Sequence, residues 1–150
     1  SKCRHIHGHN YRVHFVCTPD GWQTLETVED ETGVTEYAKL RRGDNVLDDV
    51  GRVVDFGVIK ARLCEWLEEH WDHKTLLWQE DPLLDVLEHF PRIVRESVVV
   101  VPFNPTAENM AVYLVEQIGP AMLTGTGVAL HKVVVEETRK CSATYTRSTK

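Results

Sequence analysis

The chain has 150 residues, of which 42% are hydrophobic and 27% are charged. This is the balance of an ordinary globular protein, long enough for a single domain (residues 1–150) with one hydrophobic core. A formal net charge of -6 argues against nucleic acid or anionic membranes as partners, because both need a basic field. Apolar runs such as Val98 to Val101 are far too short to span a membrane.

The four cysteines are widely spaced, and no two of them form a CxxC pair. A structural zinc site built from cysteines is therefore not expected. A core of this size needs no disulfides, so we expect reduced thiols and a cytoplasmic protein. Nor does the sequence begin with the charged and apolar segments of a secretory signal.

The first half of the chain predicts a strand, a long excursion and a helix. Apolar and polar side chains alternate over residues 10–17, which indicates a strand. Residues 18–49 are polar and contain scattered glycines, so we expect an insertion that leaves the sheet, with a short hairpin near residues 25–37. A second short strand is expected over residues 52–56. Asp55 then caps a helix whose apolar face includes Ile59, Leu63, Trp66 and Leu67.

The second half predicts a loop, one strand followed by a helix, and two final strands. Residues 72–91 are interpreted as a loop with short helical turns, and residues 97–103 as a buried strand. Thr106 is the expected N-cap of a helix that ends at Gly119-Pro120. Strands are expected over residues 130–136 and 142–147. This order favours an α+β fold with helices on one face of a mainly antiparallel sheet.

The segment Cys3-Arg4-His5-Ile6-His7-Gly8-His9 holds the richest group of possible metal ligands. Side chains two positions apart on a strand share a face, so His7 and His9 can reach one ion together. Imidazole suits Zn²⁺, and a catalytic zinc typically has three protein ligands and one open position. Cys3 has the same parity and would lie beside the ion as a reactive thiol. His5 shares the parity too, but lies about 13 Å from His9 along an extended strand, so it is the less favoured ligand. The alternative is a set of surface histidines.

Three further groups could take part in chemistry. Asp72 precedes His73 after the first helix, and a carboxylate next to an imidazole can orient it as an acid or base. Glu137 follows a β-branched strand and could accept paired N–H donors of a ligand. Thr106 and Glu108 open a helix, where capping and the helix dipole explain them equally well. The sequence has no P-loop, GxGxxG, GxSxG or HExxH motif.

Taken in order, five segments resemble the 6-pyruvoyl-tetrahydropterin synthase family. They are CRHIHGHNYRV, GRVVDFGVIK, WDHKTLL, NPTAENMAVYL and VEETRKCSATY, and they begin at residues 3, 51, 71, 104 and 135. Only three residues separate Cys3 from the first histidine of HGH. That spacing looks like the branch of the family that serves the queuosine (7-deazaguanine) pathway. The biopterin-making branch usually has a longer gap.

The resemblance implies a T-fold, in which a four-stranded antiparallel sheet carries two helices on one face and assembles into a multimeric barrel. Active sites would lie between subunits of a homo-oligomer. The implied reaction converts 7,8-dihydroneopterin triphosphate into 6-carboxy-tetrahydropterin, acetaldehyde and triphosphate, with zinc polarising oxygens of the substrate side chain.

The same resemblance implies a role for each candidate residue. His7 and His9 would hold zinc, and Cys3 would act as the catalytic base. Asp72 and His73 would complete a triad with that thiol. Glu137 would anchor the amino-pyrimidine edge of the pterin, with Thr106 and Glu108 near the same pocket.

The sequence departs from the family pattern at two places. The family's third zinc histidine lies on a strand upstream of the cysteine, so we expect both the strand and the ligand before Ser1. Residues 18–49 also form a longer connection than usual, and their Arg41 and Arg42 are weak candidates for contact with a triphosphate. Two alternatives stay open: a synthase that forms 6-pyruvoyl-tetrahydropterin by triphosphate elimination, and a pterin-binding T-fold module without catalysis.

Overall fold

The computed structural model of the protein describes residues 8–20, 27–30, 33–36, 48 and 50–148. Its main sheet consists of β1 (Arg12–Pro19), β6 (Val128–Thr138) and β7 (Cys141–Thr146) in the order β1-β6-β7. Both pairings are antiparallel. The expected α+β class and antiparallel sheet are therefore confirmed. In the described part of the chain this sheet has three strands, where the sequence led us to expect four.

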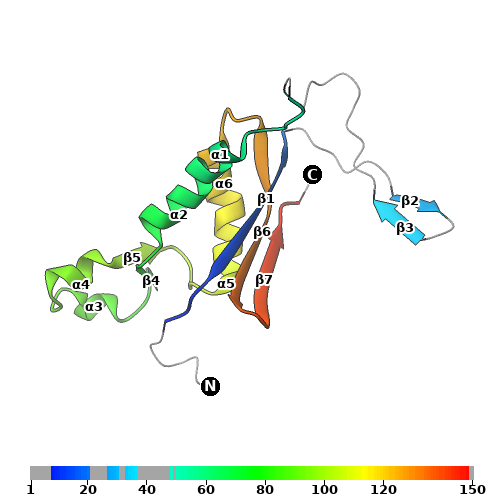
Figure 1. The fold of residues 1–150 in the computed structure, drawn as a ribbon. Coiled ribbons are helices and arrows are strands. Elements are labelled where there is room, and N and C mark those ends of the chain that lie inside the picture. The colour runs from blue at the N-terminus through cyan, green and yellow to red at the C-terminus, as the bar shows by residue number, and fades with distance from the viewer. Residues whose placement is uncertain (1–7, 21–26, 31–32, 37–47, 49, 149–150) are drawn as a thin grey trace.

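Two helical runs cover one face of this sheet (Figure 1). The first consists of α1 (Phe56–Ile59), η2 (Lys60–Cys64) and α2 (Glu65–His70). The second consists of α5 (Ala107–Tyr113), η3 (Leu114–Ile118) and α6 (Gly119–Leu123). The η segments are π-helical. Asp55 and Thr106 cap the two runs, as predicted, by accepting hydrogen bonds from the backbone N–H groups of Gly57 and Asn109.

The core lies between these helices and the inner face of the sheet. Alternate residues of β6 point inward, and they meet one side of the second helical run together with one residue of η2. The largest fully buried side chains are Leu63, Leu114, Val115, Leu130, Val133 and Val135. Burying a side chain of this size contributes about 1.5–3 kcal/mol, so each residue of this layer stabilises the fold substantially.

The second helical run continues past the point where the sequence predicted its end. Gly119 and Pro120 open α6 instead of terminating the helix. Proline is tolerated there because the first turn of a helix needs no donor from it. Gly119 is required by packing: a Cβ atom at this position would lie 2.7 Å from Cβ of Leu130. The glycine therefore marks a close approach of helix to strand rather than a helix terminus.

The expected strand over residues 52–56 is wrong. Asp48 accepts hydrogen bonds from the backbone N–H groups of Val50 and Arg52, and its carboxylate also pairs with the Arg52 guanidinium at 2.9 Å. Arg52 reaches Asp55 at 2.6 Å as well. These local hydrogen bonds between side chain and backbone hold the segment as a turn that leads directly into α1.

Two small sheets lie outside the main one. β2 (Thr27–Asp30) and β3 (Gly33–Glu36) form an antiparallel hairpin, which confirms the hairpin expected within the insertion. β4 (Thr75–Trp78) pairs in parallel with β5 (Val98–Val101). The strand β4 falls in a segment interpreted as loop, because so short an apolar run gives no usable periodicity.

The β4–β5 pair and two short helices, α3 (Leu84–Leu87) and α4 (Arg92–Glu96), project from one end of the helix layer (Figure 1). The helical turns expected around α3 are confirmed, whereas α4 was not predicted. Of β5, only Val101 is fully buried and Val100 is half-exposed, so the strand is less buried than its sequence suggested. Among the described residues, no helix is both long and apolar enough to cross a bilayer.

Replacing Leu114 with alanine is expected to lower the free energy of unfolding by about 2–5 kcal/mol, because the cavity would open in the middle of the core. Val112→Ala is the matched control, since Val112 lies on the same helical run and is 38% exposed. Guanidinium titration of both variants measures the difference. Equal losses would show that the helix does not pack as described.

Candidate active site

The predicted site residues divide into those that the structure describes and those that it does not. Cys3, His5 and His7 lie outside the described residues, so their proposed roles stay predictions. The other candidates come from the start of β1, the ends of α2 and β6, and the first turn of α5. In Figure 1 these four element ends lie toward the same end of the helix layer and sheet.

The structure brings His9 and Glu137 into direct contact. The Nδ1 atom of His9 lies 2.7 Å from Oε1 of Glu137. The two side chains are 30% and 31% exposed, so the pair is partly shielded from water and still within reach of a ligand. A predicted zinc ligand and the predicted pterin anchor, 128 positions apart in the numbering, therefore belong to one cluster.

Glu137 owes its orientation to an irregularity in the sheet. The register between β6 and β7 shifts after Glu136: Glu136 pairs with Ser142, whereas Thr138 pairs with Cys141. Glu137 is thus an extra residue on β6, the arrangement of a β-bulge. Bulges redirect side chains and are frequent beside active sites. Periodicity alone does not reveal such a position.

Tyr11 belongs to the same cluster, although the sequence identified it only as a strand residue. Its ring centroid lies 5.8 Å from that of His9. Burial, followed by the negative charge of Glu137, raises the pKa of Tyr11 above its ordinary value. Its phenol therefore stays protonated as a possible hydrogen-bond donor throughout the neutral range. The signal that could have indicated this residue is its position two residues after His9.

Asp72 and His73 form the second predicted pair. Oδ2 of Asp72 lies 2.9 Å from Nδ1 of His73, as an orienting carboxylate requires. The Asp72 side chain is 58% exposed and the His73 side chain 91% exposed. Their geometry suits proton transfer, but in the isolated chain the pair faces solvent.

Thr106 and Glu108 are explained by helix α5 itself. The hydroxyl of Thr106 accepts a hydrogen bond from the Asn109 backbone at 3.3 Å. Glu108 is exposed in the first turn, where its charge favours the helix dipole. Both residues lie at the start of α5, and helix capping together with the helix dipole accounts for them without a ligand.

The donor chemistry of His9 fits zinc. A histidine ligand commonly presents one ring nitrogen to a carboxylate, which fixes the ring and makes the other nitrogen a better ligand. Because Glu137 engages Nδ1, Nε2 is the atom of His9 that would coordinate an ion. Within the described ranges, no three His, Cys, Asp or Glu side chains gather as a metal site. The remaining predicted ligand, His7, lies outside those ranges.

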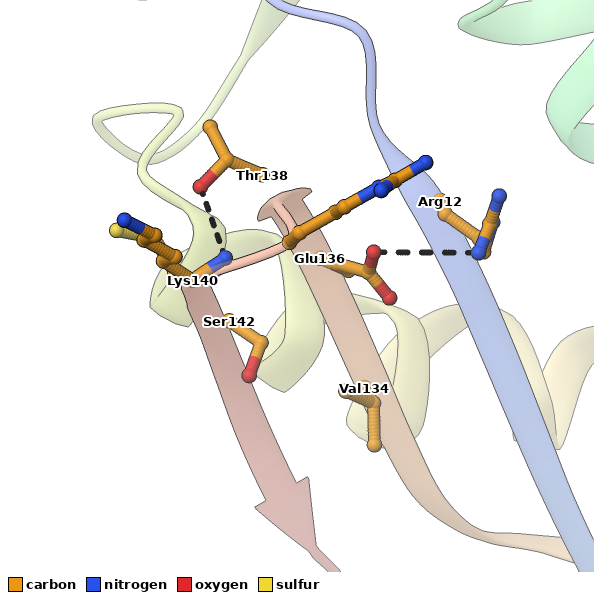
Figure 2. A pocket seen from close by; sticks show the side chains of 8 residues that line it. Arg12, Val134, Glu136, Thr138, Lys140 and Ser142 are labelled. Atoms are coloured by element: carbon orange, nitrogen blue, oxygen red, sulfur yellow. Dashed lines mark hydrogen bonds and ion pairs between the residues drawn. The ribbon is translucent and has the colours of Figure 1, made fainter.

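A separate pocket of about 570 Å³ lies at the hairpin between β6 and β7. Figure 2 shows Arg12 reaching toward Glu136, at 3.9 Å, and the Thr138 hydroxyl accepting a hydrogen bond from the Lys140 backbone. His14 approaches the same Glu136 carboxylate at 3.5 Å. None of the predicted site residues lines this pocket. Its lining consists of Arg12, Val134, Glu136, Thr138, Arg139, Lys140, Cys141 and Ser142.

The described cysteines are free thiols, and two of them differ sharply in environment. Burial raises the pKa of Cys17 to about 11, so this thiol is inert near neutral pH. Cys141 is exposed at the start of β7. Neither contacts the described pairs in a way that would make it the catalytic thiol, and Cys3 remains the candidate.

Comparison with curated proteins gives relatives of one kind. The chain is 28% identical to a 6-carboxy-5,6,7,8-tetrahydropterin synthase of Rickettsia felis. The alignment spans 141 residues, which are 94% of this chain and 83% of the relative. The chain is 29% identical, with the same coverage, to the Rickettsia bellii protein of that name. A probable 6-carboxy-5,6,7,8-tetrahydropterin synthase of Halobacterium salinarum is 30% identical over 121 residues, which are 81% of this chain and 59% of the relative.

Comparison with solved structures supports the fold. A crystal structure of an uncharacterized protein from Wolinella succinogenes matches with a TM-score of 0.67 and 23% identity, covering 98% of this chain and 82% of the other. The family model described as 6-pyruvoyl tetrahydropterin synthase matches residues 1–148, almost the whole sequence. The chain therefore belongs to the 6-pyruvoyl tetrahydropterin synthase family.

Proposed function

We propose that the protein is a lyase that converts 7,8-dihydroneopterin triphosphate and water into 6-carboxy-5,6,7,8-tetrahydropterin, acetaldehyde and triphosphate. The observation that carries the proposal is the contact between His9 and Glu137, which places a candidate zinc ligand against the candidate pterin anchor. The relatives named for this product add independent support.

Each residue then has a defined task. The two carboxylate oxygens of Glu137 accept the paired N–H donors of the amino-pyrimidine edge, which fixes the ring. His7 and His9 hold zinc, with Glu137 orienting the His9 ring. When bound, the metal supplies Lewis-acid polarisation of oxygens on the substrate side chain.

Proton transfer is assigned to the remaining three residues. The Cys3 thiolate takes a proton from the substrate side chain, and His73 moves protons to and from that site. Asp72 holds Nδ1 of His73, so that Nε2 faces the reaction. The high exposure of Asp72 and His73 in one chain supports active sites that a second copy closes in a homo-oligomer. The expectation of reduced thiols favours the cytoplasm as its location.

The direct test is an assay of the assembled, zinc-loaded protein with 7,8-dihydroneopterin triphosphate, following acetaldehyde and the pterin product together. Acetaldehyde with a 6-carboxy pterin is the expected result. A 6-pyruvoyl product without acetaldehyde would assign the protein to the triphosphate-eliminating reaction instead. Pterin binding without turnover would indicate a non-catalytic module.

Cys3→Ala is expected to abolish turnover while zinc content and pterin affinity stay near their original values, because only the base is removed. Cys141→Ala is the matched control, since this thiol is exposed and has no assigned role. Activity assays, metal analysis and pterin titration of both variants give the comparison. Near-normal turnover of Cys3→Ala would show that the thiol is not the base.

Glu137→Gln is expected to weaken pterin binding by roughly tenfold or more, because the ring loses a charged, bidentate acceptor. Zinc content should change much less, since the glutamine oxygen can still accept from Nδ1 of His9. Glu136→Gln is the control on the neighbouring position, whose carboxylate contacts Arg12 and His14 instead. Equal pterin affinity in Glu137→Gln and the original protein would remove the anchor assignment.

A further inference from the structure

His73 occupies a backbone conformation that needs an external cause. Its φ angle is +55°, and it is the only non-glycine residue with positive φ in the described part of the chain. A side chain with a Cβ atom rarely adopts this left-handed region, and such residues concentrate at functional sites. His73 itself is almost fully exposed, so its own side-chain packing does not hold it there.

The turn is instead held from its amino-terminal side. The backbone N–H groups of Trp71 and Asp72 both donate to the carbonyl of Leu67, at 2.8 and 2.9 Å. The N–H of Lys74 donates to the carbonyl of Trp71 at 3.2 Å. The backbone of Trp71 therefore anchors the turn twice: its N–H binds the end of α2, and its carbonyl binds Lys74, the residue that follows Asp72 and His73.

Trp71 is in turn fixed by aromatic packing. Its ring stacks on Tyr113 of α5, with centroids 6.1 Å apart and planes inclined by 21°. It also meets the edges of Phe103 at 6.5 Å and Trp66 at 5.3 Å. Phe103 and Tyr113 contact each other at 4.9 Å. Trp71 thus joins the end of α2 to Phe103, which precedes α5, and to Tyr113, the last residue of α5, and it packs against the hydrophobic core.

We propose that Trp71 is a positioning residue for the Asp72–His73 pair. Its packing on Tyr113 fixes the turn so that the Asp72 carboxylate stays 2.9 Å from Nδ1 of His73. That contact selects the tautomer with the proton on Nδ1 and the lone pair on Nε2. The catalytic consequence rests on the proposed function, whereas the structural consequence does not.

The test uses the assembled protein with ¹⁵N-labelled histidine, in which ring nitrogen shifts report the tautomer of each imidazole. The His73 signal is assigned by its loss in His73→Gln. Trp71→Leu should abolish the preference for the Nδ1–H tautomer and lower kcat by roughly ten- to hundredfold, with KM changed less than about twofold. Tyr113→Leu should act in the same direction. Trp71→Phe, which keeps an aromatic ring, should retain most of the tautomer preference and most of kcat.

Trp78→Leu is the matched control, because Trp78 is also half-buried but lies at the far end of β4. It should leave the His73 tautomer and kcat unchanged. If Trp71→Leu fails to assemble, Tyr113→Leu carries the same test. An unchanged tautomer in either Leu variant, or equal effects of Trp78→Leu, would overturn the proposal.

The experiment also separates this inference from the proposed function. If His73→Gln and Asp72→Asn retain full turnover, the pair has no catalytic role, and the predicted loss of kcat in Trp71→Leu has no basis. The tautomer measurement still reports whether Trp71 positions the pair. If Asp72→Asn abolishes turnover while Trp71→Leu keeps both tautomer and kcat, the proposed function stands and the positioning role is wrong.

Discussion

Burial of the inner face of β6 against the second helical run is the interaction on which the rest of the structure depends. Leu130, Val133 and Val135 meet Leu114 and Val115, all of them at or near zero exposure. Because β6 is the central strand, this contact also positions β1 and β7 through their antiparallel pairing. The close approach at Gly119 extends the same packing to the carboxyl-terminal end of the helix.

The candidate site lies where this packing ends. After Val135 the residues of β6 are only partly buried or exposed, and the bulge at Glu137 brings a carboxylate to His9. The sheet thus carries the contact between His9 and Glu137 at one end, with Tyr11 beside it and partly shielded from water. Rigid elements with an irregular end combine a fixed geometry with access for a ligand.

The acid–base pair is positioned by different means. Asp72 and His73 lie on a turn with little packing of its own, and the aromatic side chains of Trp71, Phe103 and Tyr113 connect that turn to the core. Aromatic rings suit this purpose because they bury a large area with few rotatable bonds. The two halves of the candidate site therefore depend on separate supports, one on the sheet and one between the helices.

The sequence by itself determined the fold class, both helix caps, the strands of the main sheet and the family, because periodicity, capping residues and ordered motifs are local signals. It mistook residues 52–56 for a strand and Gly119-Pro120 for a helix end, since side-chain hydrogen bonds from Asp48 and the close contact with Leu130 are invisible to periodicity. Only the tertiary structure decided that Glu137 contacts His9 and that Trp71 stacks on Tyr113. The physical reason is that such contacts join residues far apart in sequence, and their geometry depends on strand register, a bulge and helix packing.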